Sequence, residues 1–137
     1  MTPDPASNQP IYTFAGFWLS VVMGVLMYVN AWRTLFDPVK FSRYMGLPVT
    51  EGHAIPWIRV YGLRALFIGM LVTYFLFKQD PHSLQWIAAM AIPLALGDAW
   101  LVKSTGGKTA SRHVIIAVVL VISTYALHLW ATAKGTS

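Results

Sequence analysis

Residues 57–77, WIRVYGLRALFIGMLVTYFLF, form an almost unbroken apolar stretch that contains one arginine, Arg64. About twenty apolar residues in a helix span the hydrocarbon core of a bilayer. An arginine at that depth is costly unless it finds a partner. Asp98, in LALGDAWLV, is the one acidic residue inside a comparable apolar run. We therefore predict a membrane helix whose Arg64 pairs with Asp98, directly or through a water molecule.

The composition is that of a membrane protein. Of the 137 residues, 56% are hydrophobic and 11% are charged, and the mean hydropathy is +0.56. A soluble domain carries about 25% charged residues. The net charge of +5 comes from bases in short loops between apolar runs, where membrane orientation explains them better than nucleic acid does. Because there is no cysteine, thiolate catalysis and cysteine-ligated metals are excluded.

Four apolar runs predict an all-α fold, a four-helix transmembrane bundle of one domain with an up-down-up-down arrangement. The predicted helices cover residues 11–35, 56–77, 84–102 and 113–132. The polar, proline-rich residues 1–10 predict a disordered tail, and residues 133–137 predict a second tail. Between the first two helices, FSRYMGLP at 41–48 predicts a short amphipathic segment at the membrane interface.

Basic residues near the helix ends predict the orientation. Seven of them flank one side of the predicted bundle, and only Lys78 and Lys134 flank the other. The seven are Arg33, Lys40, Arg43, Arg59, Lys103, Lys108 and Arg112. Because positive loops stay in the cytoplasm, we expect both termini on the non-cytoplasmic side.

A polar layer in the cytoplasmic half forms the candidate site. Asn30, Arg64, Asp98 and His113 lie at similar predicted depths, one on each helix, and Tyr61 lies one turn from Arg64. Polar groups at this depth are expected to face inward. We predict catalytic roles for three residues and substrate-binding roles for three others, with no metal and no cofactor. The catalytic candidates are Asp98, His113 and Arg64, and the substrate-binding candidates are Asn30, Tyr61 and Trp100.

The same residues also fit structural roles. Arg64 and Asp98 can form an intramembrane ion pair that only fixes helix packing, although buried pairs often add little net stability. Asn30 can make an ordinary interhelical hydrogen bond. His113 can cap the polar end of the last helix. The sequence leaves these alternatives open.

Four motifs carry a resemblance to a known family. They are F-x-R-Y-x-G-L-P at 41–48, Y-G-L-R at 61–64, G-D-A-W-L-V at 97–102, and Arg112-His113. In this order they resemble small four-helix membrane proteins that are catalogued as a domain of unknown function and are akin to the DoxX-like group. The resemblance implies a bundle in which Arg64, Asp98 and His113 form a common site. It further implies either an enzyme of small-molecule biosynthesis or a subunit beside quinone or thiol redox chemistry.

We predict an integral membrane enzyme that performs acid–base chemistry on a lipophilic small molecule. Isomerisation, cyclisation and epoxide opening are the expected reaction types, with His113 or Asp98 moving the proton and Arg64 stabilising negative charge. One alternative is a non-enzymatic DoxX-like subunit that binds quinone, lipid or a protein partner. Another is a small proton-coupled transporter in which Asp98 titrates. We expect the lipid bilayer and a lipophilic molecule as partners, expect no nucleic acid, and leave a homodimer open.

Overall fold

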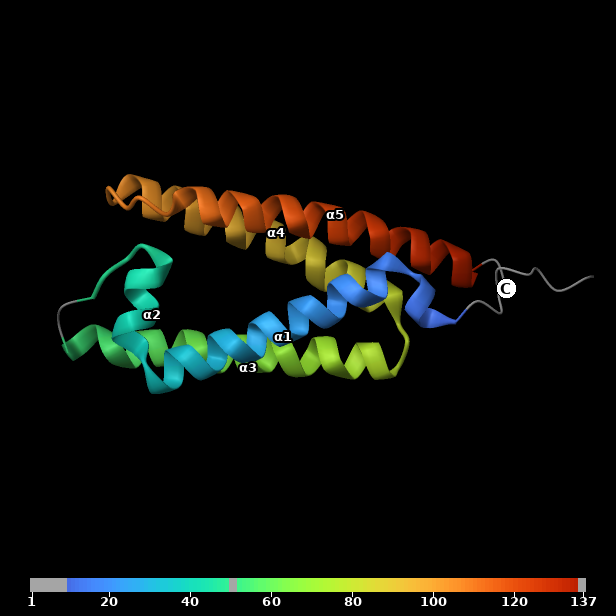
Figure 1. Ribbon diagram of the computed structural model, residues 1–137, viewed down its shortest axis with the longest axis horizontal. Coiled ribbons are helices and arrows are strands. Elements are labelled where there is room, and N and C mark those ends of the chain that lie inside the picture. The colour runs from blue at the N-terminus through green and yellow to red at the C-terminus, as the bar shows by residue number, and fades with distance from the viewer. Residues whose placement is uncertain (1–9, 50–51, 136–137) are drawn as a thin grey trace, which may run out of the picture.

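The computed structural model describes residues 10–49 and 52–135, which fold into four long helices and one short one (Figure 1). The long helices are α1 (Ala15–Phe36), α3 (Ile55–Phe77), α4 (Pro81–Ser104) and α5 (Ala110–Gly135). Each is long and apolar enough to cross a membrane. The short helix α2 (Pro38–Met45) connects α1 to α3. The predicted all-α, multi-pass, four-helix fold with a short segment after its first helix is confirmed.

The helix ends differ from the predicted bounds by up to four residues, and α4 and α5 each begin three residues earlier than predicted. α1 begins at Ala15, because Pro10 leads into a short 3-10 helix (Ile11–Thr13) and an extended Phe14 comes before α1. α5 continues to Gly135, so its last turn takes in residues that were predicted to be tail. The rest of the predicted N-terminal tail, residues 1–9, and residues 136–137 lie outside the described part of the chain.

An Asp-Pro pair begins two of the helices. Asp37 caps α2 by accepting a hydrogen bond from the Lys40 amide at 3.3 Å. Asp80 caps α4 by accepting from the amide of Ser83 at 3.1 Å and from its hydroxyl at 2.6 Å. The hydroxyl contact holds the pKa of Asp80 below its usual range. In both helices the first residue is a proline. A proline has no amide hydrogen, and an amide at this position would have no acceptor within the helix.

The long helices form two antiparallel pairs, α1 with α3 and α4 with α5 (Figure 1). The pairs converge at the end near both termini and diverge toward α2, which lies between them at the other end. Trp130, Leu127 and Leu84 are fully buried. The rings of Phe14 and Phe17 lie 6.0 Å and 6.2 Å from Trp130. The apolar core is therefore concentrated at the convergent end.

Glycines allow helices to approach closely, both between the two pairs (α1 and α5) and within one pair (α1 and α3). A Cβ added at Gly16 of α1 would lie 3.0 Å from the carbonyl oxygen of Ala126 and 3.1 Å from the Cα of Leu127 in α5. A Cβ at Gly62 of α3 would meet the hydroxyl of Thr34 in α1. Small residues of this kind let membrane helices pack backbone to backbone.

Replacing Gly16 with alanine should destabilise the bundle, because the obstacle to the new methyl group is backbone and cannot rotate away. The expected loss in the free energy of unfolding is about 1–3 kcal/mol, as for overpacking in general. Gly97→Ala is the matched control, because a Cβ there would meet nothing within 4 Å. Thermal unfolding in detergent micelles, followed by tryptophan fluorescence, measures both variants. Equal melting temperatures for the two would contradict the close α1–α5 crossing.

Candidate functional site

Three side chains from the start of α5 and the loop before it hold the end of α2. The Arg112 guanidinium donates a hydrogen bond to the carbonyl oxygen of Tyr44 at 2.8 Å. The Thr109 hydroxyl donates to the carbonyl oxygen of Met45 at 3.1 Å, and His113 Nε2 lies 3.3 Å from the same oxygen. The last carbonyl groups of a helix have no partners within that helix. Here α5 and its preceding loop supply those partners.

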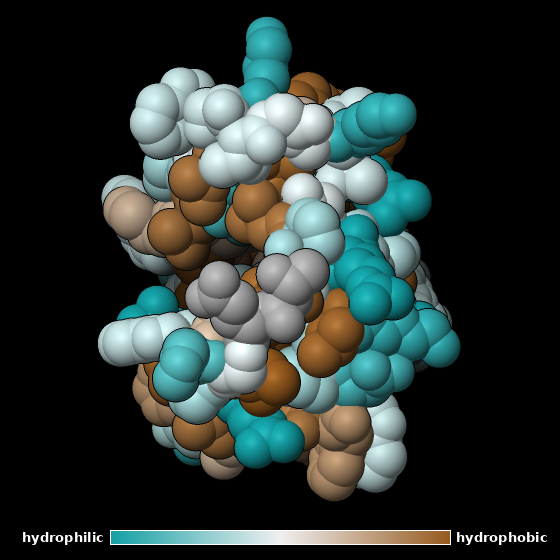
Figure 2. Space-filling model, turned by 90° about the vertical axis from the view of Figure 1, so that its left-hand side faces the viewer, coloured by the Kyte–Doolittle hydropathy of each residue, from teal (hydrophilic) through white to brown (hydrophobic). Residues whose placement is uncertain are grey.

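Aromatic contacts tie α2 to both helix pairs. The Tyr44 ring lies under two guanidinium groups, at 5.5 Å from Arg33 of α1 and 4.7 Å from Arg112 of α5. Such cation–π contacts are worth about 0.5–1 kcal/mol each at exposed sites. The Phe41 ring lies 5.7 Å from the Tyr61 ring of α3. The short helix therefore bridges the divergent end, and Figure 2 looks onto this end, where hydrophilic and hydrophobic side chains lie side by side.

His113 connects this bridge to Asp98 of α4. Its Nδ1 lies 4.0 Å from Asp98 Oδ2, while its Nε2 faces the Met45 carbonyl. A carbonyl oxygen only accepts hydrogen bonds, so Nε2 carries a hydrogen in this contact. The ring is buried, whereas half of the Asp98 side chain is exposed. We call Asp98 and His113 the dyad.

The Nδ1 of His113 and the Asp98 carboxyl group that faces it can share one proton. With Nε2 protonated, either Nδ1 also carries a proton and faces a carboxylate, or Nδ1 is bare and faces a carboxylic acid. Both forms have no net charge, which is cheaper within a membrane than a lone carboxylate. The separation of 4.0 Å exceeds a hydrogen-bond distance, so the contact has no fixed hydrogen bond and is an ion pair only when His113 carries a second proton. Such a dyad can release and take up a proton.

The expected direct pair between Arg64 and Asp98 is absent. Among the residues that the structure describes, Asp98 meets His113, and Arg64 makes neither an ion pair nor a hydrogen bond. At 1.5 Å per residue, Arg64 lies about 13 Å from the start of α3, and Asp98 about 9 Å from the end of α4. The divergence of the two helix pairs at this end adds to the separation (Figure 1).

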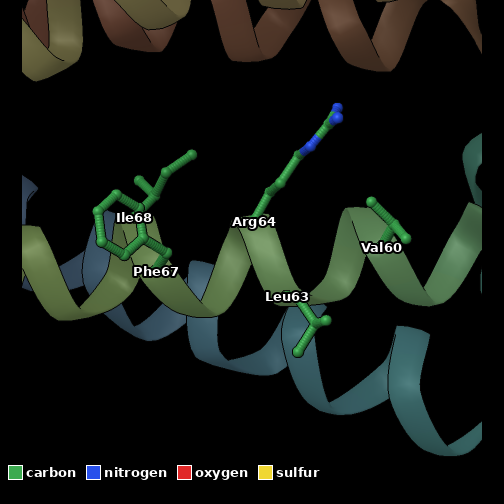
Figure 3. Close-up of a pocket in the computed structure, with 5 residues that line it drawn as sticks. All are labelled: Val60, Leu63, Arg64, Phe67 and Ile68. Carbon is green, nitrogen blue, oxygen red and sulfur yellow. The ribbon is translucent and has the colours of Figure 1, made fainter.

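Arg64 instead lies at an open hollow on α3. The hollow has a volume of about 440 Å³ and is lined by Val60, Leu63, Arg64, Phe67 and Ile68. Apart from the guanidinium, these side chains are apolar. Figure 3 shows that the Arg64 side chain extends away from α3 toward the α4–α5 pair. The hydrocarbon stem of Arg64 therefore lines the hollow, and its guanidinium lies beyond the hollow as the nearest polar group of the lining residues.

The remaining predicted residues lie at different distances from the dyad. The Tyr61 ring of α3 packs on Phe41 of α2 at 5.7 Å between centroids, so it lies at the same end of the bundle as the dyad. Asn30 of α1 is partly buried, and its side chain makes no hydrogen bond to the described residues. Trp100 is 71% exposed. It follows Asp98 by two residues, about 200° around the helix, and so lies on the opposite face of α4.

Sequence reasoning missed the residues that hold the dyad in place. They are Met45, through its carbonyl group, together with Thr109 and Arg112. One available signal was Gly46, which ends α2 in a left-handed conformation at φ 87°. A glycine directly after a short helix marks a helix end with unsatisfied carbonyl groups. The donors for these groups come from the polar loop before α5 and from the start of α5.

Comparison with known proteins identifies the family. Residues 19–127 match the family described as Domain of unknown function (DUF4267). The match covers most of the chain, so the chain belongs to this family. No curated protein and no solved structure matches the chain.

Removing the Arg112 side chain should loosen α2 without unfolding the bundle. Arg112→Ala deletes a charged hydrogen bond and a cation–π contact, together worth on the order of 1–3 kcal/mol. Amide hydrogen exchange in α2 should become about tenfold faster or more, while exchange in the middle of α4 stays unchanged. Lys108→Ala, an exposed base in the same loop, is the control. An α2 that exchanges equally in the two variants would show that Arg112 does not anchor it.

Proposed function

We propose that this member of the DUF4267 family is an integral membrane enzyme that performs acid–base chemistry on a lipophilic small molecule. Isomerisation, cyclisation and epoxide opening fit, because a proton transfer can start each of them and none consumes an oxidant or a reductant. The observation that carries the proposal is the His113–Asp98 contact at 4.0 Å, with the second ring nitrogen of His113 on the Met45 carbonyl. This arrangement leaves one proton between two groups at membrane depth.

The two members of the dyad would have different roles. The carboxyl group of Asp98 is half exposed, so it is the group that a substrate can touch, and it would give or take the proton. His113 is buried and would act through Asp98: it would hold the shared proton while Asp98 acts as a base, and return it to Asp98 before Asp98 acts as an acid. Tyr61 would donate a hydrogen bond to an oxygen of the substrate beside Asp98. A water-poor site strengthens each of these interactions.

Arg64 would stabilise negative charge on the part of the substrate that lies in the hollow. Asn30 would orient the substrate from α1, since its side-chain amide is not engaged elsewhere among the described residues. Trp100 is left out of the proposed site, because its exposed ring faces away from the dyad.

A non-enzymatic membrane subunit is the second candidate. A hollow of about 440 Å³ with apolar walls is favourable for a quinone or a lipid, as a DoxX-like kinship would imply. The dyad would then be a joint between α2, α4 and α5. A small proton-coupled transporter is also compatible with a dyad that holds one proton.

Turnover in proteoliposomes separates these functions. The wild type is incubated with membrane-soluble ketones, epoxides and polyenes, and mass spectrometry searches for products of unchanged mass or heavier by one water. Asp98→Asn and His113→Gln should each lower turnover by about 10²-fold or more with little change in melting temperature. Glutamine can still donate to Met45. His128→Gln, an exposed position further along α5, is the matched control.

Two outcomes would reject a catalytic role for the dyad. A product whose rate is unchanged in both dyad variants would remove the dyad from the chemistry. If the variants unfold and the wild type forms no product, the dyad is only a structural contact between α2, α4 and α5. Proton movement across the liposome membrane, measured in parallel with a pH-sensitive dye, identifies a transporter.

We also propose that the α2 end faces the cytoplasm, with both termini on the other side. The support is the distribution of basic residues, seven near the α2 end against Lys78 and Lys134 near the other. The chain has no cysteine, so single cysteines can be introduced cleanly. Ser104→Cys and Ser137→Cys should react with an impermeant maleimide from opposite sides of sealed vesicles. Labelling from the same side would contradict the topology.

A further inference from the structure

Arg64 is a cation without a counter-charge within the spanning part of α3. It lies about 13 Å from the start of the helix, and it makes no ion pair or hydrogen bond to the described residues. Arg59 of the same helix lies about one and a half turns nearer the end, where polar headgroups can reach it. A lone guanidinium at the depth of Arg64 is expensive unless water or an anion meets it.

The surroundings of Arg64 suit the body of a hydrophobic ligand. Val60, Leu63, Phe67 and Ile68 line the hollow with hydrocarbon, and its volume of about 440 Å³ falls within the range of small-molecule pockets. The hollow is open, and all of the residues that line it belong to α3. Figure 3 shows Arg64 as the one polar side chain among those that line the hollow.

A second copy of the chain is a poor source of the missing anion. Asp98 is the only acidic residue within the four spanning helices, and its carboxylate already meets His113. A phospholipid phosphate lies at the membrane surface, above the level of Arg64. The remaining source is an anionic oxygen on a molecule that itself dissolves in the hydrocarbon.

We propose that Arg64 binds the oxyanion of a single lipophilic acid, a carboxylate or enolate on a hydrocarbon body, which enters the hollow sideways from the bilayer. A guanidinium can hold a carboxylate through two parallel hydrogen bonds, which a lysine cannot do. The hydrocarbon body lies along Val60, Phe67 and Ile68. This inference deepens the proposed function by naming the substrate class, and binding can be tested without turnover.

The test uses the full-length protein in nanodiscs of neutral phosphatidylcholine and a long-chain fatty acid that carries a photoreactive diazirine. After illumination, mass spectrometry of peptides should find saturable labelling on α3. Dodecanoate should compete with the probe, whereas methyl dodecanoate should not. Arg64→Gln should weaken labelling by about tenfold or more, as expected for the loss of a charge-assisted hydrogen bond.

Matched variants make each result decisive. Arg59→Gln removes an exposed arginine from the same helix and should leave labelling unchanged. Val60→Trp fills the hollow and should block labelling while Arg64 is still present. Equal losses in Arg59→Gln and Arg64→Gln would reduce the effect to surface charge and overturn the proposal. Competition by methyl dodecanoate, or by phosphatidylglycerol at the same concentration as dodecanoate, would also overturn it.

Failure of this inference can be told apart from failure of the proposed enzyme. Asp98→Asn should retain fatty-acid labelling, because Arg64 and the hollow are untouched. Arg64-dependent labelling without any dyad-dependent product would sustain the binding site and reject the enzyme. A dyad-dependent product from a neutral substrate, with a rate that Arg64→Gln does not change, would sustain the enzyme and reject the anion site.

Discussion

One backbone carbonyl group, that of Met45, holds together the open end of the bundle. It accepts the Thr109 hydroxyl and faces the Nε2 of His113. The carbonyl is available because α2 ends there and has no further amide to offer it. Since His113 also faces Asp98, this one oxygen sets which ring nitrogen carries a fixed hydrogen. The placement of the remaining proton on the dyad therefore depends on the residue at which α2 ends.

The two ends of the molecule differ in how their helices are held together. The convergent end holds the fully buried residues Trp130, Leu127 and Leu84, and its helices cross at Gly16 with backbone contact. At the divergent end, the helix pairs are joined through α2 by hydrogen bonds and aromatic contacts. Regions with few buried apolar contacts open most easily. A site at that end can admit a molecule from the bilayer while the core keeps the four helices together.

The number and approximate positions of the four long apolar helices could be predicted from sequence, because run length and hydropathy fix them. The pairing within the polar layer could not be predicted. Depth alone favoured Arg64 as the partner of Asp98, but the partner is His113, because the divergence of the helix pairs and the position of α2 are tertiary features. The role of Met45 is carried by its backbone and leaves no side-chain pattern. The placement of Trp100 opposite Asp98 was available from helical spacing.

The balance of charges within the spanning helices links the dyad to Arg64. Near α2, the spanning helices carry the basic residues Arg33, Arg59, Arg64, Lys103 and Arg112, and Asp98 is their one acidic residue. Whether the dyad is an ion pair or a neutral acid and base, its net charge is zero, so the positive charge of Arg64 stays uncompensated in both states. Moving the proton within the dyad cannot remove that excess. An anion from outside the chain can, and one that also presents an acid–base centre to Asp98 would be bound by the arginine and processed by the dyad. In the proposed enzyme the hollow and the dyad would be parts of one site, and Tyr61, which packs on Phe41 of α2, lies on the same helix as Arg64.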